Sequence, residues 1–155
     1  MPLAADIAEF YTRPGRMTDA GALDALLKDA PRDISGMVVF IQNLLLHVHW
    51  AARYGVTLST ERRDEQNVRS TADMLALMQR HDGRPLSDVR ALEKRAMGTC
   101  RNFSVFGTAL FRRTGIPALP CRLRRLLQQG HLRRPLGDRI LERHGVAIAR
   151  RPDRR

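Results

Sequence analysis

Apolar residues recur at spacings of three and four along the first half of the chain, which is the pattern of helices with a buried face. The longest run predicts a helix from Ile34 to about Tyr54, capped by Asp33 and ended by Gly55 as a left-handed C-cap residue. Its apolar positions extend most of the way around the helix. We therefore expect a largely buried helix with these inner residues: Met37, Val38, Phe40, Ile41, Leu44, Leu45 and Val48.

Shorter helices are predicted before and after this one. The stretch "MTDAGALDALLKDAP" forms a short helix, with Thr18 or Asp19 as its cap. Ser59 caps another helix that runs through about Gln79 and ends at "HDGRP". A short charged helix follows at roughly Ser87–Arg95.

The last predicted helix begins inside "MGTCRNFSVF", residues 97–106. Thr99 is its N-cap, its apolar residues continue to about Arg113, and Gly115 ends it. The following "IPALPC" predicts the start of a strand, at an edge or a strand end because proline has no N–H to donate.

This placement puts Cys100 in the first turn of a helix. A thiol there lies in the positive field of the helix, which favours the thiolate, and the free N–H groups of the turn can bind an oxyanion. However, free cysteine is also among the most buried residue types, and a nucleophilic thiol needs a base within hydrogen-bond reach. The residues alone leave both interpretations open.

A wider pattern around Cys100 resembles the core of the transglutaminase-like superfamily. The run "RAMGTCRNFSVFGTALFRRTGIPAL" has Gly-x-Cys opening a helix, an arginine near the end of that helix, and then Gly-Ile-Pro-Ala. The preceding helical stretch is similar to the lead-in of bacterial transglutaminase-like domain proteins, so the resemblance covers about residues 8–120. It implies an α+β, papain-like fold, represented here mostly by its helical half with a truncated or missing sheet.

The resemblance also implies a chemistry. Cys100 would be the nucleophile of a Cys-His-Asp triad that performs acyl transfer or amide hydrolysis on protein or peptide amides, although some members of the family are non-catalytic. The family's histidine and aspartate follow the cysteine, as Asp-His-Trp and later Leu-Val-Asp, and this chain contains neither motif. Its later histidines, His131 and His144, lie in an arginine-rich segment. We therefore expect little or no such activity, and no cofactor or metal.

The missing triad partners have a structural consequence too. If the strands that should cover the Cys100 helix are lost, that helix should expose apolar surface and the fold should be weakened. A non-catalytic, transglutaminase-like interaction domain is a further interpretation of the chain.

Most of the net positive charge of the chain lies after the Gly-Ile-Pro-Ala stretch. The net charge is +11, and residues 121–155 contribute +8 of it through eleven arginines against three acidic residues. Read one base out of frame, "RRPLGDRILE" can encode Val-Asp-His-Trp and "ARRPD" can encode Leu-Val-Asp, in the family's order. We hypothesise a frameshift between about Ile116 and Leu123, which would make residues 121–155 an out-of-frame, poorly ordered tail.

The alternative from another class is a small helical protein with a genuine basic arm that binds nucleic acid. No aromatic residues are interleaved with the arginines of residues 121–155, so this partner is possible but not favoured.

Other polar residues indicate no second site. His47 and His49 are two apart on the predicted helix and point about 200° apart, so we expect packed or interface histidines rather than a shared metal, with Trp50 in the core. The run "ERRDE" is expected to be a solvated helix face. Arg101 and Asn102 have no assigned role.

The remaining bulk properties suggest one reduced, cytoplasmic domain. The chain has 155 residues and two cysteines, too few for a disulfide framework, and Cys121 is expected in a strand. The N-terminus lacks a signal-peptide pattern, and Met37–Trp50, the most apolar stretch, is too short and too polar to span a bilayer, so no membrane partner is expected.

Overall fold

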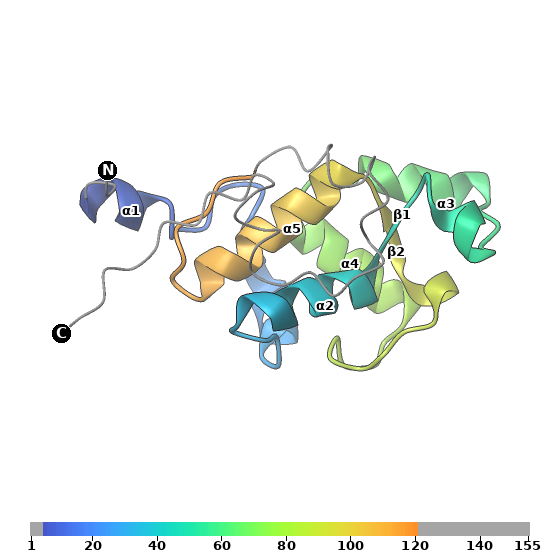
Figure 1. The fold of residues 1–155 in the computed structure, drawn as a ribbon, viewed down its shortest axis with the longest axis horizontal. Coiled ribbons are helices and arrows are strands. Elements are labelled where there is room, and N and C mark those ends of the chain that lie inside the picture. The colour runs from blue at the N-terminus through green and yellow to red at the C-terminus, as the bar shows by residue number, and fades with distance from the viewer. Residues whose placement is uncertain (1–4, 121–155) are drawn as a thin grey trace.

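The computed structural model describes residues 5–120 of the chain (Figure 1). This part combines helices with a small two-stranded parallel sheet, which is an α+β arrangement. Residues 121–155, with Cys121, His131 and His144, lie outside the described residues. The helices and strands are α1 (Ala5–Phe10), α2 (Ile34–Leu44), β1 (Leu45–His47), α3 (Thr60–Asp64), α4 (Thr71–His81), β2 (Ala96–Gly98) and α5 (Cys100–Arg113).

Four short 3₁₀ segments complete these elements, at Gly21–Leu27, Ala51–Tyr54, Glu65–Asn67 and Leu92–Lys94. Between residues 5 and 120, no helix has both the length and the apolar character that a membrane crossing requires.

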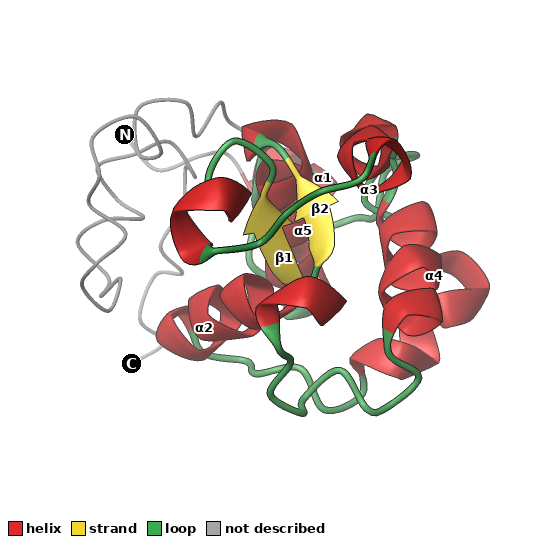
Figure 2. Ribbon diagram, turned by 90° about the vertical axis from the view of Figure 1, so that its right-hand side faces the viewer, coloured by secondary structure: helices red, strands yellow, loops and turns green. Residues whose placement is uncertain are grey.

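The two strands lie between α2 and α4 in the view of Figure 2, with α2 against β1 and α4 against β2. The register pairs Leu45 with Ala96 and His47 with Gly98. Because α2 leads directly into β1 and β2 leads into α5, the carboxyl ends of the two strands bring His47 and the start of α5 to one edge of the sheet.

Both faces of the sheet are buried. Leu45 and Ala96 belong to the main core between α2, α4 and α5, whereas Leu46 and Met97 belong to a second apolar cluster with residues of the segment from 48 to 58. The largest buried side chains of the main core are Leu27, Met37, Leu44, Met74, Leu75, Met78, Phe106, Leu110 and Phe111.

The long helix predicted from Ile34 to Tyr54 is wrong in its second half. The helix ends at Leu44, the chain continues as β1, and Ala51–Tyr54 is only a 3₁₀ turn, which Gly55 ends with a left-handed φ of 76°. Residues 44–48 are buried without interruption, and a continuous apolar run fits a doubly buried strand as well as it fits a helix.

The helix predicted from Ser59 to Gln79 is interrupted. It ends as α3 at Asp64, and α4 begins at Thr71 with a second N-cap, Ser70, whose hydroxyl accepts the Asp73 N–H at 3.1 Å. The first predicted helix is likewise shorter than expected and is the 3₁₀ segment at residues 21–27.

Two other predicted elements are wrong. The segment Ser87–Arg95 is not a continuous helix and has only the 3₁₀ turn at Leu92–Lys94. The Asn43 side chain donates to the Asp88 carbonyl at 2.7 Å and accepts the Arg90 N–H at 2.8 Å, which takes these backbone groups out of a helical pattern. Residues 116–120 form no strand in the part of the chain that the structure describes, although the Ala118 N–H donates to the Tyr11 carbonyl at 3.1 Å.

The apolar residues of α5 are not exposed, contrary to expectation. Val105, Phe106, Leu110 and Phe111 are buried, and α5 contacts α2, α4 and β2. The helices of the described part therefore already cover much of the Cys100 helix.

Candidate functional site

Cys100 is the first residue of α5, two positions after the end of β2, and it is half-buried. The turn before it is held by Asn102, whose side-chain oxygen accepts the Thr99 backbone N–H at 2.8 Å. The amide nitrogen of Asn102 donates to the Val68 carbonyl at 2.7 Å, and the residue is only 2% exposed. The start of α5 is therefore tied both to its own N-cap and to the loop before α4.

Gly98 is required by this turn for a steric reason. A Cβ at position 98 would lie 2.9 Å from the Cβ of Asn102, closer than real side chains approach. The Gly-x-Cys pattern thus has a local cause, since the missing side chain makes room for the residue that fixes the start of the helix.

His47 lies beside the thiol, a contact that the sequence pattern does not predict. It ends β1 opposite Gly98, is 7% exposed, and places its Nε2 3.9 Å from the Cys100 Sγ. On a continuous helix His47 would have had no reason to approach residue 100. The strand pairing brings the two together.

The protonation of His47 follows from its other nitrogen. The backbone N–H of His49 donates to His47 Nδ1 at 3.3 Å, so the neutral ring is assigned its proton on Nε2, the nitrogen that faces the sulfur. Burial, and after it the charge of His49, lowers the pKa of His47 to about 4. At neutral pH the ring is therefore uncharged, and in the assigned tautomer it presents an N–H to Cys100.

The surroundings of this pair are partly apolar. The Phe103 ring lies 6.2 Å from that of His47, between centroids, and the ring of the exposed His49 lies 5.5 Å away. The Arg101 guanidinium turns to the Gln66 carbonyl at 2.8 Å. Within residues 5–120 no three histidine, cysteine or acidic side chains gather as a metal ion would require, and His49 points to solvent.

The predicted solvated face at "ERRDE" is wrong for two of its residues. Glu65 is buried and accepts from Arg62 at 2.6 Å, from His81 Nε2 at 2.7 Å and from the Met97 N–H at 2.8 Å. Arg62 also contacts His81 and donates to the Arg95 carbonyl at 2.6 Å. This buried cluster ties the end of α3 and the end of α4 to β2, just before Gly98.

The prediction that Trp50 lies in the core is wrong. This residue is half-buried, and the guanidinium of Arg53 lies 5.6 Å from its ring centroid. The short 3₁₀ turn after β1 leaves the indole at the surface, where a cation can cover it.

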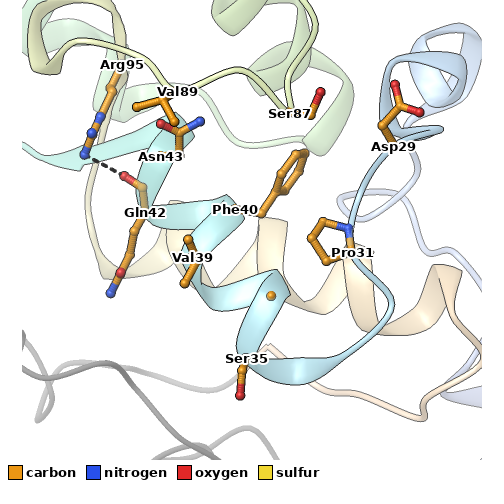
Figure 3. Close-up of a pocket in the computed structure, with 11 residues that line it drawn as sticks. Asp29, Pro31, Ser35, Val39, Phe40, Gln42, Asn43, Ser87, Val89 and Arg95 are labelled. Carbon is orange, nitrogen blue, oxygen red and sulfur yellow. Dashed lines mark hydrogen bonds between the residues drawn. The ribbon is translucent and has the colours of Figure 1, made fainter.

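A groove of about 670 Å³ opens elsewhere, between the exposed side of α2 and the segment from 87 to 95 (Figure 3). Val39 and Val89 are its exposed apolar residues, and Arg95 closes one end by donating to the Gln42 carbonyl at 2.9 Å. Neither Cys100 nor His47 lines it, so the groove and the thiol are separate features.

Comparison with models of protein families, with curated proteins and with solved structures gives no match to this chain.

Proposed function

We propose that this chain carries Cys100 as the nucleophile position of a transglutaminase-like, papain-like domain, without the histidine and aspartate that complete the family's triad. The sequence support is the Gly-x-Cys and Gly-Ile-Pro pattern on either side of the predicted helix. The structural support is that Cys100 begins a 14-residue helix shortly after a buried strand and is half-buried.

The observation that carries the proposal further is the state of the neighbouring imidazole. The nitrogen of an amide substrate leaves as an amine only if a general acid protonates it. In a cysteine enzyme that acid is normally the imidazolium that forms when a histidine takes the thiol proton. Because Nδ1 of His47 accepts the His49 N–H, the neutral ring is assigned its proton on Nε2, and that nitrogen then has no lone pair to take the thiol proton. We accordingly propose Cys-dependent acyl chemistry for the intact family domain, and little or no transfer from amides by this chain.

The test incubates the full chain with a glutamine-containing peptide and a labelled primary amine at pH 7. The expected result is no labelled peptide beyond that formed by the Cys100→Ala variant. Turnover that depends on Cys100 would overturn the proposed lack of activity. A Cys100 that iodoacetamide also fails to modify in the folded protein would overturn the nucleophile position itself.

A second candidate function is favoured by one observation, the +8 charge of residues 121–155. If these residues form a nucleic-acid-binding arm, affinity for DNA or RNA should fall steeply with salt, and deleting residues 122–155 should remove both the affinity and its salt dependence. Affinity that survives the deletion, or that does not change with salt, would exclude this function.

A further inference from the structure

We propose that His47 acts on Cys100 as a hydrogen-bond donor to the thiolate rather than as a base, so that the acyl donors this site accepts are activated esters and thioesters. This inference rests on the proposed function, because it assumes that Cys100 is a nucleophile. It adds a positioning residue outside the expected triad and a class of substrate.

The position of His47 is fixed from two directions. Its backbone is held in β1 by pairing with β2 opposite Gly98, and its ring accepts the His49 N–H at Nδ1. The residue is 7% exposed, and its Nε2 lies 3.9 Å from Sγ. Such contacts are often long before a substrate is bound, and donation to a thiolate is charge-assisted.

The groups around the pair do not favour an imidazolium. The hydrogen bonds of the His47 ring, among the described residues, are those to the His49 N–H and to the Cys100 sulfur. The other titratable and charged groups beside the pair are His49, which opposes a positive charge on His47, and Arg101, which is bound to the Gln66 carbonyl. If His47 took the thiol proton at Nε2, both ring nitrogens would carry protons, and Nδ1 would need a hydrogen-bond acceptor. The group at Nδ1 is instead a donor, the His49 N–H.

The chemistry follows from this arrangement. The thiol proton leaves to solvent, and the thiolate attacks the ester carbonyl carbon to form a C–S bond. The N–H groups of Cys100 and Arg101 at the start of α5 would be the donors to the oxyanion that results, since the Asn102 N–H is already bound by the Thr99 side chain. The C–O bond then breaks, and its electron pair leaves on an oxygen that needs no proton. An amide nitrogen cannot leave in this way, and the acyl-Cys100 thioester persists because no base activates water.

The experiment uses the full chain with p-nitrophenyl acetate at pH 7. The expected result is a burst of p-nitrophenolate stoichiometric with the chain, with one acetyl group on Cys100 by peptide mass mapping and no burst from Cys100→Ala. The amide analogue, p-nitroacetanilide, should give no release.

Two variants separate donation from proton abstraction. His47→Gln retains an N–H near the sulfur and should acylate within about twofold of the wild type, whereas His47→Leu should be about tenfold slower. Because His47→Leu removes a buried residue, its melting temperature is measured alongside. If His47→Leu does not fold, the tautomer of His47 in the wild type is measured instead. An NMR spectrum of the isotope-labelled chain shows which ring nitrogen carries the proton.

The outcomes are distinguishable. A proton on Nε2 at pH 7 supports the donor role, whereas a proton on Nδ1 or on both nitrogens overturns it. Equal acylation of the wild type and His47→Leu, or a Gln variant as slow as the Leu variant, overturns the inference and leaves the nucleophile position standing. Absence of any acetyl group on Cys100 overturns the proposed function, and the inference with it.

Discussion

The buried carboxylate of Glu65 is predicted to hold the strand that leads to Cys100. It accepts the Met97 backbone N–H at 2.8 Å from a position 32 residues earlier in the chain, and it also accepts from Arg62 and His81. Replacing Glu65 by alanine therefore removes the acceptor of three groups at once: the Arg62 side chain of α3, the His81 side chain of α4 and the Met97 N–H of β2.

The magnitude depends on which partners are left without a bond. Met97 is buried, so its orphaned N–H costs about 1–3 kcal/mol. Arg62 loses less, because it keeps the carbonyls of Glu93 and Arg95 as acceptors. With the cavity that the shorter side chain leaves, we expect Glu65→Ala to lower the free energy of unfolding by about 3 kcal/mol. Glu65→Gln keeps one acceptor oxygen and should cost about 1 kcal/mol.

Urea unfolding followed by circular dichroism at pH 7 measures these differences. Asp64→Ala is the matched control, because the neighbouring Asp64 is exposed, and its effect should stay within about 0.5 kcal/mol. If Glu65→Ala were no more destabilising than Asp64→Ala, the carboxylate would not hold β2 and the reasoning would be refuted.

Three further predictions concern the site and the tail. The folded-state pKa of His47 is lowered to about 4, so the stability from its neutral ring is present above pH 6.5 and is lost as the pH falls toward 4. Allowing for solvent screening, we expect the wild type to lose about 2 kcal/mol more than His47→Gln between pH 7 and pH 4 in urea titrations. Gly98→Ala should destabilise by about 1–3 kcal/mol through its clash with Asn102, whereas Gly83→Ala, whose added Cβ would meet nothing nearer than 3.9 Å, should be neutral in the same assay. The nucleotide sequence of codons 115–155 should contain histidine and aspartate motifs in the neighbouring frame, and stop codons in that frame would end the frameshift hypothesis.

Elements with strong local signals could be predicted from the sequence. The N-cap at Asp33 is confirmed, since its carboxylate accepts the Gly36 N–H at 2.7 Å. The cap at Ser59 is confirmed in the same way. The helix expected after Thr99 is observed as Cys100–Arg113, followed by Gly115 in a left-handed conformation. Caps and glycine ends depend on residues within one helical turn, so a local pattern is enough to find them.

The parts that could not be predicted depend on distant partners. β1 has three residues, buried on both faces, and it exists as a strand because β2 pairs with it from 51 positions further along the chain. The approach of His47 to Cys100 is a consequence of that register, as the burial of Glu65 is a consequence of its bond to Met97. The spacing of apolar residues within either segment does not predict such contacts, because they join residues far apart in the sequence.

The central proposal is that Cys100 is a nucleophile at the start of a helix rather than a core cysteine. The rate at which iodoacetamide modifies Cys100 at pH 7 tests this most directly, measured by peptide mass mapping in the folded chain and in the same chain unfolded by urea. The helix terminus and the His47 N–H exist only in the folded state, so we predict modification about tenfold faster in the folded chain. Slower modification in the folded chain would show a buried core cysteine and contradict the account.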